Sequence, residues 1–334
     1  MPARCAAAGH DVGVSDLLPM LATPGTHVPP GEEWCHEVKW DGVRALATIT
    51  AGEVALRSRN GNSITPAWPE LTTPPPVGSD TVVDGEIIAL NERGVPDFRV
   101  LMDRMHVRKA ATVARLARRV PATFMVFDVL RLAGTDLCDL PLTERRRRLA
   151  DLDLAGSGWQ VPVEYDDGPM LFDATRAQGL EGIVSKRRDS PYRPGVRSPH
   201  WLKFAHRHRG SYVVGGWRPQ TGTSDRLAAL LVGEVTGEGL RYRGRVGSGI
   251  GAKQTRLLTE LLAPLHRGAS PFADEVPRID ATGCTWVEPV VVVDVDTHGS
   301  GYERLRQPSF QGVRSDLSPD DLAPDAAAAD GGAD

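Results

Sequence analysis

A lysine followed closely by an Asp-Gly pair is the feature of the sequence best suited to covalent chemistry. It lies in the stretch Glu37-Val38-Lys39-Trp40-Asp41-Gly42-Val43-Arg44. A lysine amine has a reference pKa of ~10.4 and is a poor nucleophile until burial or neighbouring cations remove its proton. The Asp-Gly pair predicts a tight turn that presents Lys39 at the end of a strand. Taken alone, the pattern is equally typical of an ordinary turn.

Six further polar motifs follow Lys39 in the chain. They are Ser58–Gly61 (SRNG), Asp84–Glu86 (DGE), Phe127–Leu130 (FDVL), Glu181–Lys186 (EGIVSK), Arg197–Lys203 (RSPHWLK), and Arg306–Phe310 (RQPSF) with Arg314 and Asp316. Packing gives no reason for these residue types in this order. Over about residues 16–317 the series resembles the nucleotidyltransferase motifs of ATP-dependent DNA ligases. The likeness is greatest to the short bacterial accessory ligases of the C type and to the ligase domain of the D type, which Pro19–Ala22 (PMLA) and Gly215–Pro219 (GGWRP) also resemble.

The resemblance implies a reaction at phosphorus. Lys39 would attack the α-phosphate of ATP, expel pyrophosphate and hold AMP through a phosphoramidate. Because that phosphorus is surrounded by negative charge, cationic partners are required. Arg197 and Lys203 are the expected α-phosphate clamps. Arg44 and Arg59 are the expected contacts to phosphate or ribose, which later meet the 5′-phosphate of a DNA nick.

Carboxylates and one aromatic ring complete the implied site. Glu86 would contact ribose and a metal ion, and Glu181 would be the second carboxylate supporting that metal. Mg²⁺, or Mn²⁺, suits such oxygen ligands. Phe127 would stack on adenine and Glu37 would accept the adenine amino group, although the apolar strand around Phe127 also fits a core residue. Asp128 is expected to fix the geometry of the site.

Two positions depart from the family pattern. Ala205 stands where the family commonly has a second lysine after Lys203, and Leu317 follows Asp316 where the family usually has a lysine. Each change removes one cation from the phosphate site. A charge-assisted contact contributes ~1.5–3 kcal/mol, so each loss is expected to slow the reaction about 10–100-fold.

Strand and helix patterns predict the elements that position these motifs. Alternation predicts strands near residues 45–55, 81–90, 124–130 and 182–185, and helical periodicity predicts helices near 110–120 and 143–151. After residue 210, short strands alternate with glycine-rich turns, which predicts a small antiparallel barrel.

The expected fold class is therefore α+β. It comprises an ATP-grasp-like nucleotidyltransferase (adenylation) domain of antiparallel sheets and helices, followed by an OB-fold β-barrel. The expected boundaries are an N-terminal extension over 1–15, the adenylation domain over 16–205, the OB-fold domain over 206–316, and a disordered acidic tail over 317–334.

Candidates for contact with DNA or pyrophosphate lie in the second half of the chain. They are Arg241, Arg243, Arg245, Arg306, Arg314 and Asp316. The first three alternate along a predicted strand, so they are expected on one face, where they could follow a phosphate backbone. A solvated strand face is the alternative. The four arginines at 145–148 are interpreted as a solvated helix face.

Composition excludes several classes of protein. The chain has 334 residues, 41% hydrophobic and 25% charged, which is typical of a globular protein of about two domains. No apolar run approaches the ~18 residues of a membrane span. Four scattered cysteines without a CxxC pair argue against a zinc site or a disulfide framework and favour a reducing cytoplasm. The net charge of −4 argues weakly against a nucleic-acid partner, but an acidic tail offsets a mildly basic second half.

The sequence thus predicts an ATP-dependent DNA ligase that seals nicks in double-stranded DNA during repair, with ATP and Mg²⁺ or Mn²⁺ as cofactors. Only 38 residues precede Lys39, so we expect a minimal ligase, cytoplasmic and associated with the nucleoid. A repair polymerase or an end-binding protein is a candidate partner, and a membrane is not. The alternatives are an RNA ligase or capping-type nucleotidyltransferase, and a nick-binding module deficient in turnover.

Overall fold

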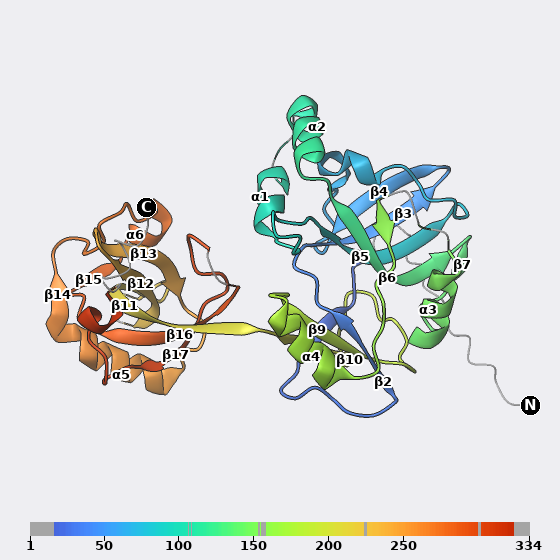
Figure 1. The fold of residues 1–334 in the computed structure, drawn as a ribbon. Coiled ribbons are helices and arrows are strands. Elements are labelled where there is room, and N and C mark those ends of the chain that lie inside the picture. Colours follow the sequence, from blue (N-terminus) through green and yellow to red (C-terminus); the bar gives the residue numbers. More distant parts are fainter. Residues whose placement is uncertain are drawn as a thin grey trace, which may run out of the picture. The chain divides into compact units, whose positions relative to one another are not determined.

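The chain folds into two compact units that divide after Ala205 (Figure 1). The computed structural model describes residues 17–105, 107, 109–152, 154, 158–223, 226–299 and 302–323. The expected N-terminal extension over 1–15 lies outside these residues.

The first unit contains a four-stranded sheet that carries the lysine motif. Its strands are β1 (Leu21–Pro24), β2 (Trp34–Val38), β9 (Gly182–Arg187) and β10 (Arg197–Ala205). The order is β1-β10-β9-β2, with β1 parallel to β10 and the other pairs antiparallel. Lys39 follows β2 directly, so the pairing of β2 with β9 positions its backbone.

A six-stranded sheet in the same unit carries the motifs that contain Arg59, Glu86 and Phe127. It contains β3 (Val43–Thr50), β4 (Glu53–Ser58), β5 (Thr81–Ile88), β6 (Thr123–Leu132), β7 (Thr135–Asp136) and β8 (Trp159–Gln160). The order is β4-β3-β5-β6-β7, and β8 pairs with β6 in parallel. The strand expected over 45–55 is a hairpin, because Ala51 (φ 51°) and Gly52 (φ 81°) turn the chain between β3 and β4.

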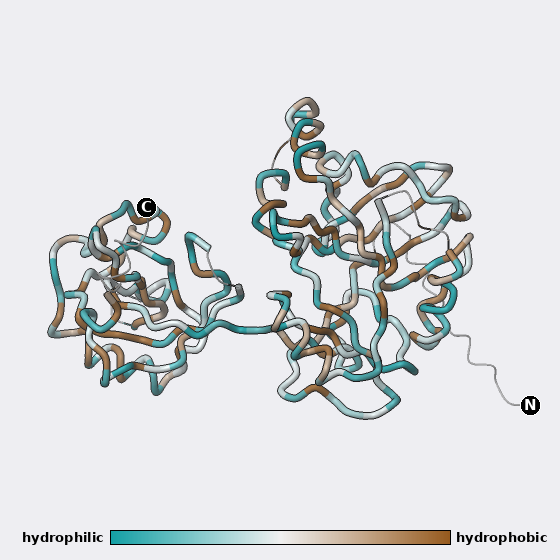
Figure 2. Tube along the Cα trace, viewed as in Figure 1, coloured by the Kyte–Doolittle hydropathy of each residue, from teal (hydrophilic) through white to brown (hydrophobic). Residues whose placement is uncertain are grey.

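Helices cover the two sheets at several points. They are α1 (Arg99–Met105), α2 (Ala110–Arg119), α3 (Leu142–Ala150) and α4 (Gly168–Ala177), with 3₁₀ turns η2 (Thr65–Ala67) and η3 (Pro69–Leu71). Helix α3 packs on β6, and α4 packs on β9 and β2. The two helices expected near 110–120 and 143–151 are confirmed. Figure 2 shows the apolar residues of the unit concentrated on its inner strands.

The interpretation of the four arginines on α3 as a solvated face is wrong for two of them. Arg145 is fully buried, and its guanidinium donates to both carboxylate oxygens of Asp128 at 2.8 and 2.9 Å. Arg146 is also buried and donates to the carbonyl of Pro162 at 2.6 Å. These two positions face β6, which the local pattern of charge could not reveal. Asp128 thus joins β6 to α3 through Arg145.

The second unit is a curled antiparallel sheet with a helix against it. Its strands are β11 (Arg207–Pro219), β12 (Leu227–Thr236), β13 (Gly239–Val246), β14 (His266–Arg267), β15 (Thr285–Val287), β16 (Val292–His298) and β17 (Ser309–Val313). Its helices are α5 (Ala252–Leu262), η4 (Ala263–Leu265), α6 (Arg278–Ala281) and η5 (Pro319–Leu322).

The described strands of this unit do not close into a barrel. The long β11 pairs with β12, β15 and β16, and the sheet runs from β13 at one end to β17 at another. These strands curl around one shared core that includes Val232, Val246 and Phe310. Near that core the two ends meet at an isolated bridge between Ser248 and Ser309. The second unit is therefore a curled sheet whose two ends meet at that bridge without closing fully.

The segment 317–323, expected as part of a disordered tail, is ordered. Leu317 and Leu322 pack on a cluster that contains Tyr242 and Phe272. Ser318 caps the η5 turn through its backbone N–H and hydroxyl, both donating to Asp321 at 2.8 and 2.7 Å. The overall composition of this segment is polar, but its two leucines, five residues apart, supply enough apolar contact to hold it on the cluster. Residues 324–334 lie outside the described part.

Candidate active site

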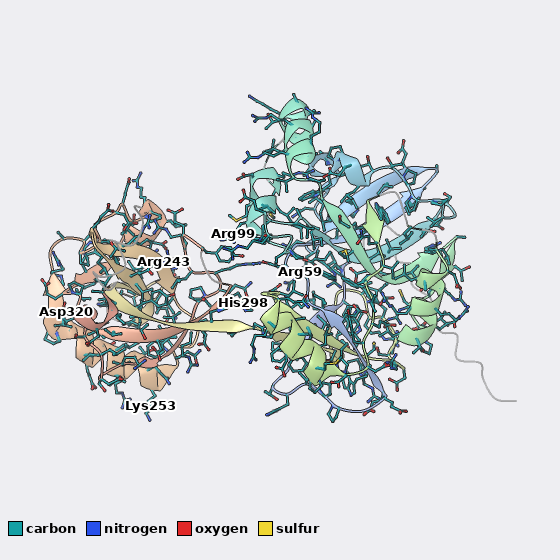
Figure 3. The ribbon with its side chains drawn as sticks, in the orientation of Figure 1. Arg59, Arg99, Arg243, Lys253, His298 and Asp320 are labelled. Atoms are coloured by element: carbon teal, nitrogen blue, oxygen red, sulfur yellow. The ribbon has the colours of Figure 1, made fainter. Side chains whose placement is uncertain are left out.

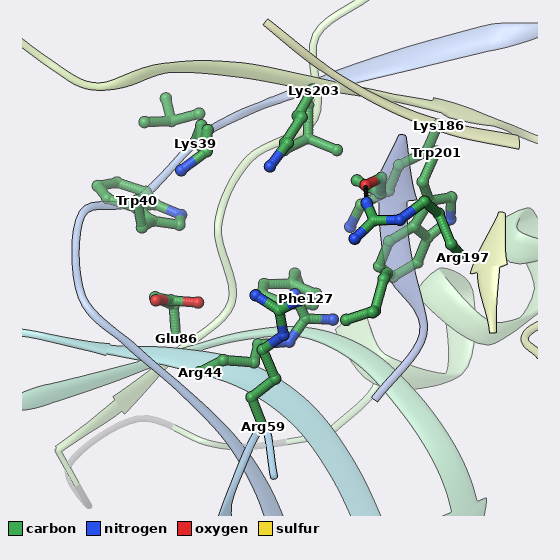
Figure 4. A pocket seen from close by; sticks show the side chains of 14 residues that line it. Lys39, Trp40, Arg44, Arg59, Glu86, Phe127, Lys186, Arg197, Trp201 and Lys203 are labelled. Atoms are coloured by element: carbon green, nitrogen blue, oxygen red, sulfur yellow. Dashed lines mark hydrogen bonds between the residues drawn. The ribbon is translucent and has the colours of Figure 1, made fainter. Parts of the chain in front are cut away.

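A pocket of about 200 Å³ lies between the two sheets of the first unit (Figure 4). Seven of the nine residues expected at the nucleotide and metal site line it, and Glu37 and Glu181 do not. The seven are Lys39, Arg44, Arg59, Glu86, Phe127, Arg197 and Lys203. They come from both sheets and from segments up to 164 positions apart, so the tertiary fold brings the motifs together.

Lys39 is held at the wall of this pocket by backbone and side-chain contacts. Its N–H donates to the carbonyl of Gly182 at 2.8 Å, which extends the β2–β9 pairing by one residue. Its amine lies 2.6 Å from Glu181 Oε1, and about a fifth of the side chain is exposed. The carboxylate therefore orients the amine while leaving it accessible from the pocket.

The Asp-Gly pair after Lys39 acts through backbone geometry. A Cβ on Gly42 would lie 2.2 Å from the carbonyl oxygen of Ile87 in β5, so no larger residue fits. Asp41 accepts a hydrogen bond from the N–H of Phe98 at 3.4 Å, just before α1. The turn thus binds the lysine segment to β5 on one side and to the start of α1 on the other.

Cations gather beside the amine. Arg197 and Lys203 lie on the same face of β10, and Arg59 follows the end of β4. Burial lowers the pKa of Lys203, and the charges of Lys39, Arg197 and Arg59 lower it further. The same positive charges that disfavour protonation of Lys203 favour binding of an anion. A group of several cations suits a polyphosphate.

Glu86 provides the opposite charge on the floor of the pocket. It lies on β5, and burial raises its pKa to about 8, although Arg44 and Lys39 act against that rise and Glu181 adds to it. Among the described residues no group of three metal-ligating side chains is preassembled. Mg²⁺ bound with a nucleotide typically takes one or two carboxylates and completes its shell with phosphate oxygens and water. Glu86 and Glu181 fit that kind of donor set.

A buried network fixes Arg44 against the aromatic wall. Arg44 donates to both oxygens of Asp84 at 2.6 and 2.7 Å, and the Tyr192 hydroxyl donates to the same carboxylate at 2.6 Å. The guanidinium lies 4.6 Å from the centre of the Phe127 ring. Arg44 is therefore a rigid cation, with its orientation set by a carboxylate that is itself fully buried.

Glu37, one of the two expected residues that do not line the pocket, lies behind the pocket wall. It is buried and pairs with Lys186, whose amine donates to Glu37 Oε2 at 2.7 Å. The other oxygen, Oε1, accepts no hydrogen bond from the residues that the structure describes, and it lies 3.9 Å from Arg146. An unsatisfied buried acceptor next to an aromatic-lined pocket fits the amino group of a purine.

Sequence reasoning missed Lys186 as a member of the pocket. Its amine lies 4.3 Å from the centre of the Phe127 ring and 4.4 Å from that of Trp201. Val184 and Lys186 alternate on β9 and both line the pocket. The period of two along that strand was the signal that could have identified it.

The second unit contains a polar groove of about 690 Å³ that Arg241, Arg243 and Arg306 line. Arg243 donates to the carbonyl of Tyr302 at 2.7 Å, and Arg306 donates to the Tyr302 hydroxyl at 3.1 Å. Arg314 and Asp316, by contrast, pair with one another, at 2.7 Å.

The expectation that all three strand arginines share one face is wrong. The β12–β13 register shifts between Val232 and Gly233, so Arg243 is an extra residue at a β-bulge. A bulge moves every later side chain to the opposite face. Arg245 consequently faces away from the groove and lies 3.3 Å from Asp280, which also accepts from Tyr242.

Comparison with known protein families supports this geometry. The model of the ATP dependent DNA ligase domain matches residues 19–204, and that of the ATP dependent DNA ligase C terminal region matches residues 223–317. The chain belongs to the ATP-dependent DNA ligase family. The solved structures that match the chain are DNA ligase catalytic cores, and its described elements are mostly strands with few helices, so the expected α+β class is confirmed.

Individual ligases show the same relationship. The chain is 36% identical over 316 residues to the multifunctional non-homologous end joining protein LigD of Mycolicibacterium smegmatis, covering 92% of this chain and 39% of that protein. It is 34% identical to DNA ligase C of Mycobacterium tuberculosis, covering 73% and 70%. A solved mycobacterial DNA ligase D complexed with ATP and MES matches with 35% identity and a TM-score of 0.54, covering 93% of this chain and 99% of that one. The chain thus spans about two fifths of the length of the LigD relatives.

Proposed function

We propose that the protein is an ATP-dependent DNA ligase that forms a covalent adenylate on Lys39. The observation that carries this proposal is the position of the Lys39 amine, 2.6 Å from Glu181 at the wall of a pocket that also contains Arg197, Lys203 and Glu86. A nucleophile, phosphate-binding cations and two carboxylates are the groups that transfer of a nucleotidyl group requires.

The first step follows from these positions. The unprotonated Lys39 Nζ attacks the α-phosphorus of ATP, an N–P bond forms, and the bond to the bridging oxygen breaks as pyrophosphate leaves. Arg197 and Lys203 stabilise the negative charge that develops on the α-phosphate oxygens. Glu181 orients the amine at 2.6 Å and is placed to take part in removal of its proton.

Nucleotide selection would use the aromatic side of the pocket. Phe127 and Trp201 present ring surfaces there, and Glu37 Oε1 offers the unsatisfied acceptor for the adenine amino group. GTP has a carbonyl oxygen at that position, so a carboxylate acceptor favours ATP. This preference weighs against a capping-type guanylyltransferase.

Mg²⁺, or Mn²⁺, fits the donors Glu86 and Glu181, and when bound it would neutralise phosphate charge. Glu181 lies 2.6 Å from the Lys39 amine, and the charges of Lys39 and Glu181 both act on Glu86. The small number of carboxylates suits an ion that arrives with the nucleotide and keeps several water ligands.

The polymer substrate is proposed to be nicked double-stranded DNA in a repair reaction. After Lys39 adenylation, AMP would pass to the 5′-phosphate at the nick, and attack by the 3′-hydroxyl would release AMP and join the strands. Arg241 and Arg243 in the groove of the second unit are candidates for contact with the DNA backbone. Relatives named for non-homologous end joining support a role in the repair of DNA ends.

Labelling with α-³²P-ATP and Mg²⁺, followed by denaturing electrophoresis, tests the proposal. The wild-type protein should retain label and Lys39→Ala should not. Lys253→Ala, which removes an exposed lysine on α5 (Figure 3), should label normally. Label on Lys39→Ala at the wild-type level would refute the assignment of the nucleophile.

Two further measurements separate the alternatives. Labelling by α-labelled GTP in preference to ATP would indicate a capping-type enzyme. Label transfer without sealing of a nicked duplex would indicate a nick-binding module deficient in turnover, the reading that Ala205 and Leu317 motivate.

A further inference from the structure

Helix α2 carries a cluster of cations that the proposed reaction does not use. Arg115, Arg118 and Arg119 are all exposed, and α2 contains no acidic residue. Within the part of the chain that the structure describes, none of the three contacts a carboxylate. Figure 1 shows α2 standing out from the body of the first unit.

The three arginines form a single face. Residues three and four apart lie together on a helix, so Arg118 and Arg119 are both neighbours of Arg115. The buried Val113 lies on the opposite side of the helix, and α2 packs on the η2 and η3 turns. The helix therefore uses its apolar side for the fold and leaves the cationic side to solvent.

This arrangement differs from the other arginine-rich helix of the unit. On α3, Arg147 and Arg148 both pair with Glu144, at 2.8 and 2.9 Å. Like charges at these spacings repel one another and weaken a helix unless a counter-ion is supplied. The helix dipole favours cations in the last turn and so accounts for Arg118 and Arg119, but Arg115 lies a turn earlier.

Composition does not explain the cluster either. The whole chain has a net charge of −4, so unpaired cations are not a consequence of a general basic excess. The arginine face is also unobstructed, because Ala111 lies four residues before Arg115 and Ala114 four residues before Arg118. Small side chains at those positions allow a rigid partner to approach the helix closely.

The helix is connected to the candidate active site through α1. Phe98, whose N–H donates to Asp41 at 3.4 Å, precedes α2 by only twelve positions. The seven residues of α1 span about 10 Å, and the next four residues span at most about 14 Å. The arginine face thus starts within about one turn of duplex DNA, ~34 Å, of the segment that carries Lys39.

We propose that Arg115, Arg118 and Arg119 on α2 bind the phosphate backbone of duplex DNA beside the nick. The guanidinium group binds phosphate through two parallel hydrogen bonds, and such contacts position DNA without reading its sequence. This inference rests on the proposed ligase function, which supplies the DNA. An acidic protein partner is the competing occupant that the experiment below separates.

The test compares two triple variants with equal change in charge. Arg115→Gln/Arg118→Gln/Arg119→Gln removes the face, and Arg147→Gln/Arg187→Gln/Arg193→Gln removes three surface arginines that pair with carboxylates. Binding of a fluorescent 30-base-pair duplex with one nick is measured by anisotropy in EDTA, from 50 to 200 mM salt. Each lost phosphate contact flattens the log–log salt dependence by about 0.9, so the α2 variant should lose up to about 2.7 in slope.

The α2 variant should also bind at least about 10-fold more weakly at 50 mM salt, while the control triple should match the wild type. Labelling of Lys39 by ATP should be unchanged in both, because that step needs no DNA. Unchanged affinity and slope in the α2 variant would overturn the proposal and would favour an acidic protein partner for the arginine face. An equal loss in the control variant would also overturn the proposal. Failure of the wild type to label would instead refute the ligase function.

Discussion

Replacement of Arg145 by methionine should be far more damaging than the same replacement at Arg147, two positions along the same helix. Arg145 and Asp128 have no exposed side-chain surface, and two hydrogen bonds join them. Arg145 also donates to the carbonyls of Leu140 and Ser190, at 2.6 and 3.0 Å. The methionine variant would leave a buried carboxylate and two carbonyl groups without this donor.

The size of the effect follows from burial. Removal of one partner from a buried ion pair costs about 3–5 kcal/mol. In a unit of this size, 1 kcal/mol corresponds to about 2–4 °C in Tm, so Arg145→Met should lower Tm by about 6–20 °C. The side chain of Arg147 is 62% exposed in its pair with Glu144. Arg147 also pairs with the exposed Asp151 at 3.3 Å. Exposed pairs at these helix spacings contribute about 0.2–0.5 kcal/mol each, so Arg147→Met should lower Tm by at most about 4 °C.

Thermal unfolding followed by circular dichroism measures both variants under one condition. Asp128→Leu/Arg145→Met should recover part of the lost stability, because an apolar pair leaves no buried charge. Recovery should be incomplete, because the two carbonyl groups stay unsatisfied. Equal losses of Tm in Arg145→Met and Arg147→Met would refute the reasoning that burial, rather than sequence position, decides the role of each arginine.

Three other outcomes are expected. Glu181→Gln should slow ATP labelling by at least about 10²-fold, as loss of a charge-stabilising group does, with little change in Tm. A large loss of Tm with a normal labelling rate would instead indicate a structural role for Glu181. Gly42→Ala should reduce the labelling rate at least about 10-fold, because the new Cβ would lie 2.2 Å from a β5 carbonyl oxygen; a wild-type rate would show that the turn tolerates displacement. In binding of nicked duplex DNA, Arg241→Gln/Arg243→Gln should reduce the log–log slope of affinity against salt by up to about 1.8, and Arg245→Gln should leave that slope unchanged. Equal effects per arginine would contradict the inference that the bulge turns Arg245 away from the groove.

The sequence by itself determined the family of the protein and many of the residues that line the pocket. The resemblance of seven motifs, in order, to those of DNA ligases predicted Lys39, Arg59, Glu86, Arg197 and Lys203, all of which line the pocket. Such prediction succeeds because each motif is local: a strand with a period of two, or a tight turn, fixes its own side chains. The helices α2 and α3 were predictable for the same reason.

Only the tertiary structure decided what surrounds each residue. The run at 145–148 has one residue type, yet burial against β6 separates Arg145 and Arg146 from their neighbours. A single bulge in β13 turns Arg245 to the other face, although the sequence alternates without interruption. Lys186 reaches Glu37 across 149 positions. Burial, register and long-range pairing depend on partners distant in the chain, and a local pattern carries no information about them.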